Sequence, residues 1–587
     1  MTTRPIYFGP TGTPMLGWFH APETVRRDVG ILLCPPVGPD YACSYHLMRV
    51  LAELLEAAGF PTFRFDYPGV GDSSGSDADP DRVGAWLGGV GYAADELKRR
   101  SGCQALGVVG LRLGGLLAWH SVAGRPDVAS FASWWGVGSG RKYVRNLRLY
   151  GLAATGSGTA AAGSDVESGG YVFSAETLDG LVQLDPATVT PVLRTRALFI
   201  QRDDQSLDDP LVERLRNQGH QVDCWSRGGI DAIAKTPHES TIPDPLLREL
   251  VSWLSASHPE RAGSRGAADP MPGDFDILAQ TTIPFEGTEV QETVVRFGPG
   301  LVGVVSHCDN RSRVTTGLLV LPGSSGHRVG THRISVPLAR ESATRGYVAL
   351  RFELGGNGDS PAPTGAPSNQ PFPPHAAANV KAAVEVMRRE YGLESVVVLG
   401  HCAGAWATYR AAVANAGADE YILLNWMNVD ATPGGIAAKE DVVNYREAER
   451  LKGSVRSWEK WRRLLSGRTS PLKVGGIVMR RVRSAIARTL RPSHGRLAID
   501  PGVGVEMIEI LARARFTLIF SHALGPTYFR MQAGRLFDRL ERDRGFRLVT
   551  LTSEDVGFGT TAVRHQLFGT LRDHLARRYP VEASVDG

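Results

Sequence analysis

The sequence lacks the segments that carry proteins into or across a membrane. Residues 1–5 (Met-Thr-Thr-Arg-Pro) do not open a basic segment followed by an apolar core and a small-residue cleavage site. No apolar run is long enough to span a bilayer. We therefore expect a cytoplasmic protein with no transmembrane segment.

Cysteine is scarce, and the 65 basic and 61 acidic residues nearly balance. Six cysteines occur in 587 residues without a Cys-x-x-Cys pair, so the sequence predicts reduced thiols and neither a disulfide framework nor a zinc site. The net charge of +4 is too small to indicate a nucleic-acid partner. No motif indicates a metal or a cofactor. The oligomeric state stays open.

The sequence does contain one order of segments twice. Apolar strands at 30–34, 61–66 and 106–109 are followed by strands of the same kind at 317–321, 349–354 and 396–399. The second strand of each set leads into Gly-Asp-Ser, at residues 71–73 and 358–360. Strands alternating with helices predict βαβ units and a mostly parallel, doubly wound sheet. At 587 residues the chain is too long for one core, so we expect two tandem α/β domains.

The predicted domains are residues 1–256 and 275–587. They are joined by a linker, 257–274, in a stretch where Pro, Gly, Ser and Ala predominate. Each domain carries an insertion: a small-residue surface segment at 151–170, and apolar positions at helical spacing in about 430–500 that predict two amphipathic cap helices. The second insertion is strongly basic. Such a face is usually only solvated, but it also suits a membrane surface or an anionic substrate such as an acyl-CoA or carrier-bound phosphopantetheine.

The third strand of the second unit enters the turn Gly400-His401-Cys402-Ala403-Gly404, which a helix follows. This context is typical of a nucleophile elbow, in which two glycines let strand and helix close around a central side chain. Cys402 is therefore the candidate nucleophile. We expect the oxyanion donors to be the amide of Ala403 and an amide of the loop that begins Gly323-Ser324.

The base for this thiol is harder to assign. After the last strand, where a histidine is expected, the sequence has Asp555 and then Val556. His522, at the end of the preceding strand, is the best substitute, with Asp555 as the carboxylate that orients it. The side chain of His401 should point away from the thiol, and His565 lies in a later helix.

The first unit has the opposite deficiency. His238 follows its last strand, and Asp203 or Asp204 stands at the acid position, but Arg112 occupies the nucleophile site. A guanidinium stays protonated and cannot attack a carbonyl. These four residues therefore predict either an ion-pair network left by a degenerate triad or an anion-binding site. A site shared between the units, with His238 serving Cys402, would require the two sheet edges to face each other.

These motifs together resemble a known family. The relevant segments of the first unit are 34–36, 64–73, 110–114 and 139–143. They resemble bacterial serine aminopeptidase-like α/β-hydrolases, some of which accompany exosortase and exopolysaccharide loci. The second unit, through 327–330, 350–353, 358–360 and 400–404, is similar to a sister group in which cysteine at the elbow is usual. It departs from that group where Asp-His-x-Phe is expected and Asp555-Val556-Gly557-Phe558 stands. The resemblance implies two tandem α/β-hydrolase domains, each with a cap insertion.

Two functions follow as hypotheses. In the first, the second domain is an acyl-ester or thioester hydrolase or an acyltransferase. Cys402 is its nucleophile, the acyl substrate is a small molecule that is free or linked to CoA or a carrier, and the first domain is non-catalytic. In the second, both clefts are degenerate, and the protein is a pseudoenzyme that acts as a binding or scaffold protein.

Overall fold

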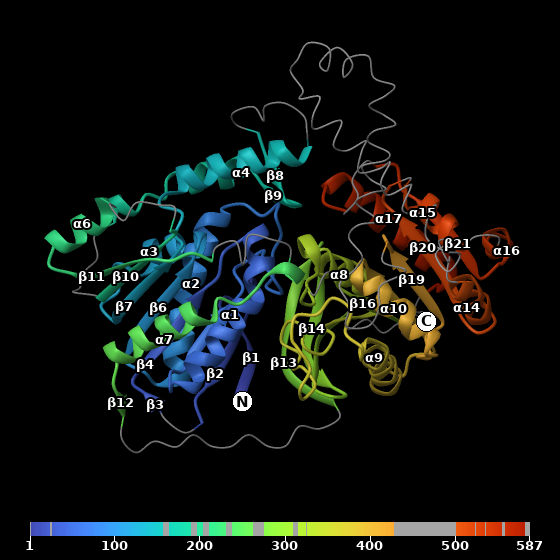
Figure 1. Ribbon diagram of the computed structural model, residues 1–587, viewed down its shortest axis with the longest axis horizontal. Coiled ribbons are helices and arrows are strands. Elements are labelled where there is room, and N and C mark those ends of the chain that lie inside the picture. Colours follow the sequence, from blue (N-terminus) through green and yellow to red (C-terminus); the bar gives the residue numbers. More distant parts are fainter. Residues whose placement is uncertain are drawn as a thin grey trace, which may run out of the picture.

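The computed structural model describes residues 2–23, 26–155, 164–189, 196–203, 210–229, 237–261, 275–308, 315–323, 326–427, 501–522, 524–533, 536–553 and 558–581. These residues form two large sheets in succession along the chain, each with helices on both faces (Figure 1). The predicted α/β architecture, with mostly parallel and doubly wound sheets, is confirmed. We call residues up to 261 the first half and residues from 275 the second half.

The first sheet has eight strands in the order β1-β2-β5-β4-β6-β7-β10-β11. They are β1 (Thr2–Phe8), β2 (Met15–Ala21), β4 (Val29–Cys34), β5 (Thr62–Phe65), β6 (Ala105–Leu111), β7 (Val128–Trp134), β10 (Arg196–Gln201) and β11 (Gln221–Ser226). Strands β1 and β2 run antiparallel at one edge, and the others are parallel. All six residues of β4 are buried, as expected for a strand covered on both faces.

Helices cover both faces of this sheet. Helices α2 (Arg82–Ser101) and α3 (Leu113–Val122) pack on one face, and α1 (Pro39–Ala57) and α7 (Asp244–Ser257) on the other. Helix α6 (Pro210–Asn217) lies between β10 and β11 in the chain. Strand β12 (Glu260–Arg261) pairs with β3 (Arg26–Arg27), so part of the predicted linker pairs with the first half; the domain boundaries stay a prediction.

The cap of the first half lies between β7 and β10 in the chain. It consists of α4 (Gly140–Thr155), a hairpin of β8 (Val166–Ser168) and β9 (Tyr171–Phe173), and α5 (Ala175–Val182). The sequence predicted only a surface segment for 151–170. Residues at its end instead form the hairpin, because Val166 and Phe173 are apolar and pack into the core of the first half.

The second sheet has nine strands in the order β13-β14-β15-β17-β16-β18-β19-β20-β21. They are β13 (Phe275–Phe285), β14 (Thr288–Phe297), β15 (Leu301–His307), β16 (Thr316–Leu321), β17 (Val348–Phe352), β18 (Ser395–His401), β19 (Glu420–Leu424), β20 (Arg515–Phe520) and β21 (Phe546–Thr550). Strands β13 to β15 are antiparallel and the rest parallel. Apart from the extra edge strand β13, the order repeats that of the first sheet.

The helices of the second half also form two layers. Helices α9 (Ala376–Tyr391), α10 (Ala403–Val413), α14 (Pro501–Leu511), α15 (Leu524–Ala533) and α16 (Phe537–Arg542) belong to one layer, and α8 (Ser335–Thr344) and α17 (Thr561–Arg578) to the other. The predicted cap at about 430–500 lies outside the described residues. In the described part of the chain, no helix combines the length and hydropathy needed to cross a membrane.

The two halves share a hydrophobic core at one edge of each sheet. Leu16 and Trp18 of β2 pack with Val294 of β14 and with Val302 and Val304 of β15. The halves therefore meet through their antiparallel strands, at the opposite edges from β11 and β21.

The two Gly-Asp-Ser loops have the same local structure. The hydroxyl of Ser73 accepts a hydrogen bond from the amide of Leu16, and the hydroxyl of Ser360 accepts one from the amide of Val302, both at 2.9 Å. Each serine thus ties its loop to the neighbouring strand of its own half. The aspartate before each serine is left to face the other half.

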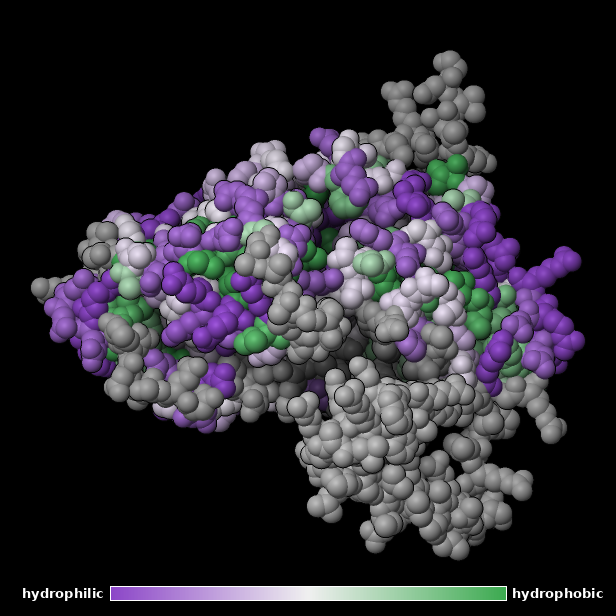
Figure 2. Space-filling model, turned by 90° about the horizontal axis from the view of Figure 1, so that it is seen from above, coloured by the Kyte–Doolittle hydropathy of each residue, from purple (hydrophilic) through white to green (hydrophobic). Residues whose placement is uncertain are grey.

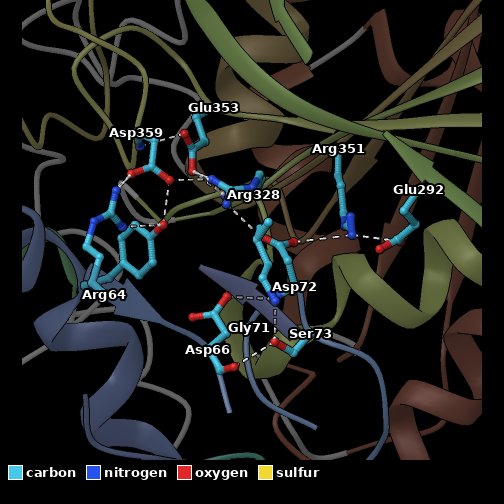
Figure 3. A network of polar contacts seen from close by, with 12 residues as sticks. Arg64, Asp66, Gly71, Asp72, Ser73, Glu292, Arg328, Arg351, Glu353 and Asp359 are labelled. Atoms are coloured by element: carbon cyan, nitrogen blue, oxygen red, sulfur yellow. Dashed lines mark hydrogen bonds and ion pairs between the residues drawn. The ribbon is translucent and has the colours of Figure 1, made fainter. Parts of the chain in front are cut away.

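Each aspartate pairs with an arginine of the opposite half (Figure 3). Arg64 of β5 forms an ion pair with Asp359, and Arg351 of β17 lies 3.3 Å from Asp72. Arg64 and Arg351 occupy the same place in the two repeats. The contact between the halves is therefore reciprocal.

Arg328 joins the two loops at the centre of this network. Its side chain is fully buried and contacts Asp72 at 2.7 Å, Asp359 at 2.7 Å and Glu353 at 2.9 Å. Tyr41 takes the corresponding place in the first repeat and donates its hydroxyl to Asp66 at 2.6 Å. Buried charges of this kind are costly unless every one is paired, so the two loops fit together in one register only.

Two further arginines of the second half bind carbonyl oxygens of the first loop. Arg333 donates to the carbonyls of Gly71, Ser73 and Gly75 at 2.6–2.8 Å, and Arg340 donates to the carbonyl of Asp72 at 2.9 Å. A buried turn has carbonyls that no strand partner satisfies, and guanidinium donors satisfy them here.

The carboxylates of this interface have displaced pKa values. Burial raises the pKa of Asp66 and of Glu353 to about 7 each, and the charge of Asp72 adds to the effect on Asp66. Burial also disfavours the charged form of Glu292, but Arg340 and Arg351 outweigh it and lower its pKa to about 2. The balance between burial, neighbouring carboxylates and neighbouring arginines therefore differs from one carboxylate to the next.

We predict that Asp72→Asn lowers the free energy of unfolding by about 3–5 kcal/mol, because it leaves Arg328 and Arg351 buried with one partner fewer. Urea unfolding of the full chain measures this. The control is Glu385→Gln, which breaks an exposed pair with Lys381 and should cost less than about 1 kcal/mol. Equal losses in the two variants would contradict the prediction.

The pKa of Glu292 predicts a pH dependence of stability. A carboxyl whose folded pKa is about 2 stabilises the fold above its unfolded pKa, about 4.3, and this contribution disappears as pH falls toward 2. The difference amounts to about 3 kcal/mol. Unfolding measured from pH 6 to pH 2 should therefore show a smaller acid loss in Glu292→Gln than in the wild type, although this variant is less stable at pH 6. Parallel pH profiles would refute it.

Candidate active site

The turn after β18, the predicted nucleophile elbow, has a strained backbone. Cys402 has φ 52° and ψ −110°, between the end of β18 and the start of α10. Its amide donates to the carbonyl of Leu424 at 2.9 Å, and its carbonyl accepts from Trp406 at 3.2 Å. A non-glycine residue in this region costs about 1–3 kcal/mol, which the surrounding structure must offset.

Two glycines let the strand and helix close on each other. A β-carbon placed on Gly400 would lie 2.2 Å from the Gly404 carbonyl oxygen, and one on Gly404 would lie 2.4 Å from the carbonyl oxygen of Pro322. Both contacts are with backbone atoms, which cannot rotate away. The elbow therefore depends on glycine at both positions.

The predicted oxyanion loop lies beside the thiol residue. A β-carbon placed on Gly323 would be 3.3 Å from the β-carbon of Cys402, so the backbone of Gly323 borders the elbow. Ala403 is the first residue of α10, where helix amides have no acceptor within the helix. Both predicted amide donors thus flank Cys402. Ser324 lies outside the described residues.

His522 stands at the end of β20, two strands from Cys402. Strand β19 lies between them. Asn425 follows β19 directly, and its Oδ1 accepts a hydrogen bond from the amide of Ser521 at 2.9 Å. Two strand spacings separate the backbones by about 10 Å. A histidine and a cysteine that extend toward each other can span that separation. His522 is half-buried.

The other histidines near the elbow are placed differently. His401 is buried, and its ring meets that of Phe558 edge-on at 5.4 Å. His565 is exposed on α17. Asp555 and Val556 lie outside the described residues. Across the described part of the chain, no group of three or more His, Cys, Asp or Glu side chains has the arrangement of a metal site.

The first half has the same elbow with a different centre. Arg112 has φ 55° and ψ −124°, and its Nε donates to Asp40 Oδ2 at 3.1 Å. Asp40 lies in the first turn of α1, two residues after Gly38. A β-carbon placed on Gly38 would lie 3.1 Å from the ring of Phe173, which belongs to the cap hairpin. Tyr143 of α4 is buried nearby, and burial together with Asp40 raises its pKa. Arg112 is therefore paired within the first half, close to side chains of the cap.

The remaining predicted residues of the first site are described only in part. Asp203 is exposed, and its carboxylate lies close to Gly228. Asp204 and the side chain of His238 lie outside the described residues. Asn369 of the second half donates to the carbonyl of Pro237 at 3.0 Å, so the segment containing His238 touches the second half. The site shared by His238 and Cys402 stays a prediction.

The cap hairpin of the first half also reaches the second half. Glu167 Oε1 accepts hydrogen bonds from the amide of Thr561 at 2.7 Å and from its hydroxyl at 3.0 Å, and Arg564 donates to the carbonyl of Gly170. Thr561 begins α17, the helix after the last strand. A carboxylate of one half therefore caps a helix of the other, a favourable use of the helix dipole.

Asp40 and Glu167 form contacts that the sequence did not reveal. Asp40 follows Gly38-Pro39, which is a helix-start signal, but nothing local marks it as the partner of a residue 72 positions away. Glu167 and Thr561 are 394 positions apart. Only the folded chain brings these pairs together.

No protein-family model and no curated protein matches the chain. Solved structures resemble parts of it. Est1E from Butyrivibrio proteoclasticus is 12% identical, with a TM-score of 0.33, and the match covers 43% of this chain and 98% of that one. A soluble variant of monoglyceride lipase from Saccharomyces cerevisiae, in complex with a substrate analogue, is 14% identical, with a TM-score of 0.33 and coverage of 44% and 97%. An esterase from Pyrococcus furiosus is 15% identical, with a TM-score of 0.31 and coverage of 43% and 90%. Likeness at this level carries no argument about activity.

We predict that Gly404→Ala lowers the free energy of unfolding by about 1–3 kcal/mol, because its methyl group meets the Pro322 carbonyl. The control is Gly91→Ala in α2, where a β-carbon meets nothing within 4 Å. There alanine should stabilise the helix by up to about 1 kcal/mol. Urea unfolding compares the two variants, and a neutral Gly404→Ala would argue against the tight elbow.

Proposed function

We propose that the second half is an acyl-ester or thioester hydrolase or acyltransferase that uses Cys402 as its nucleophile. The observation that carries the proposal is the backbone of Cys402, held at φ 52° between two glycines with Gly323 beside it. Strain of this kind costs stability and clusters at functional sites, and of the two strained turns only this one carries a nucleophile. A thiol is also a competent nucleophile once it is deprotonated.

In the proposed reaction His522 accepts the thiol proton, and the thiolate attacks the acyl carbon of the substrate. A bond forms between the Cys402 sulfur and that carbon, and the amides of Ala403 and of the Gly323-Ser324 loop stabilise the oxyanion. The bond to the leaving oxygen or sulfur then breaks, and the leaving group takes the proton from His522. Water, or an acceptor alcohol or thiol, releases the acyl group. Asp555 is proposed to orient His522.

The first half is proposed to be non-catalytic. The Arg112–Asp40 pair supports this, because a paired guanidinium stands where the nucleophile would be. We further propose the finer family assignment, to serine aminopeptidase-like hydrolases, from the motifs quoted above. A CoA- or carrier-linked acyl substrate is the form that the basic cap sequence favours.

A second candidate function is a binding or scaffold protein with two inactive clefts. One observation favours it: valine stands at position 556, where the resemblance implies a histidine. Under this proposal Cys402 is a structural thiol in an inherited turn.

We predict that Cys402→Ala lowers the hydrolysis of short-chain acyl thioesters and p-nitrophenyl esters by at least about 1,000-fold, because the nucleophile is lost. His522→Asn should lower kcat and remove the acid limb of the pH–rate profile. Mass spectrometry after a brief incubation with an acyl electrophile should find the label on Cys402.

The matched control is Cys308→Ala, which removes a half-buried thiol of the same half far from the elbow in sequence. Its rates should equal those of the wild type. If all six thiols are labelled at the same rate and Cys402→Ala retains the wild-type rate on every substrate, the pseudoenzyme proposal stands instead.

A further inference from the structure

Helix α4 presents an outer face that no described element covers. The helix follows β7 and lies in the cap, and in Figure 1 it runs along the upper side of the first half, next to β8 and β9. Tyr143, Val144 and Leu147 are buried and fix its inner face. The residues on the opposite side of the helix from these three face outward.

The outer face is basic and carries two large apolar side chains. No acidic residue occurs between 140 and 155. Leu149 and Tyr150 are 59% and 67% exposed. The exposed residues that matter here are Arg141, Lys142, Arg145, Leu149 and Tyr150. At 100° per residue, Leu149 lies between Arg145 and Lys142 on the helix surface. Figure 2, seen from above, includes the side of the first half on which α4 lies, where hydrophilic residues surround smaller hydrophobic areas.

The stability of the helix does not account for this face. Arg141 and Lys142 lie in the first turn, where positive charge opposes the helix dipole. Among the described residues, none of the four basic side chains of α4 forms a salt bridge that would offset this. An exposed leucine contributes nothing to the core either. The composition of this face does not stabilise the isolated protein, but it would suit binding to a partner.

We propose that the outer face of α4 docks on an anionic lipid bilayer. A basic helix face attracts the negative surface of such a bilayer, and an apolar side chain among the basic ones enters the boundary between headgroups and acyl chains. The long basic side chains can reach phosphates while Leu149 inserts between them. An acidic soluble protein would pair with the charges but offers no apolar interior for an exposed leucine in their midst.

The chain supplies a second, independent observation in its sequence. Residues 451–499, inserted at the corresponding place of the second half, contain 13 Lys and Arg and only one acidic residue, Glu459. Both insertions follow the strand after an elbow, so docking through α4 would turn the elbow side of the first sheet toward the lipid. The proposal does not depend on the chemistry of Cys402.

Co-sedimentation of the full chain with lipid vesicles tests this. The wild type should bind vesicles that contain phosphatidylglycerol and should not bind vesicles of phosphatidylcholine alone. Arg141→Glu/Arg145→Glu should lower the partition coefficient by at least about tenfold, since each basic residue near an anionic surface contributes to binding. Leu149→Ser/Tyr150→Ser should lower it severalfold, and this loss should persist at high salt.

The control is Arg99→Glu/Arg248→Glu, which makes the same change in net charge on exposed positions of α2 and α7. It should bind as the wild type does. Circular dichroism melting shows whether each variant is folded. The proposal is overturned if the wild type does not bind anionic vesicles, if the control loses as much binding as the α4 variant, or if Leu149→Ser/Tyr150→Ser binds unchanged.

Discussion

The reciprocal pairing of arginines with the aspartates of two repeated loops holds the two halves together. Arg64 pairs with Asp359 and Arg351 with Asp72, while Arg328 contacts both aspartates. All of these groups are buried, so each charge is compensated only when the other half is in place. If the two halves separated, these charges would lose their ion-pair partners. We therefore infer that the two sheets unfold as one unit.

The contacts between the halves also connect the surroundings of the two elbows. In the first half, Arg112 and Asp40 form an ion pair whose side chains stay partly exposed. Glu167 of the cap hairpin accepts a hydrogen bond from the amide at the start of α17 in the second half. The first half thus helps to set the position of a helix next to the second elbow. A half without a nucleophile can still be necessary for the other half's site.

Local patterns in the sequence predict the framework well. Runs such as Val396–Leu399 and Leu318–Leu321 are apolar because they become central strands, and the glycines around Cys402 and Arg112 mark both elbows. The antiparallel strands β13 to β15 were not predicted. In β13, three apolar residues (277–279) are followed by three polar ones (280–282), so it lacks the alternation that marks a half-buried strand.

Contacts between distant residues could not be predicted. Arg328 lies 25 positions from Glu353 but more than 250 from Asp72, and nothing in its neighbours signals a central place. The relation of His522 to Cys402 depends on the number of strands between them, which follows from the sheet order and not from the sequence. Local chemistry determines the elements, and the pairing of the two halves determines which side chains meet.

The reciprocity of the loop contact has a consequence for the history of the chain. An interface in which the same loop of each copy meets the same strand of the other is isologous, the arrangement of a twofold homodimer. The tandem protein has the geometry of such a dimer whose subunits have become one polypeptide. In a true homodimer any change at the elbow appears in both subunits at once. After fusion each elbow can change alone, so one could acquire Arg112 while the other kept the thiol of Cys402.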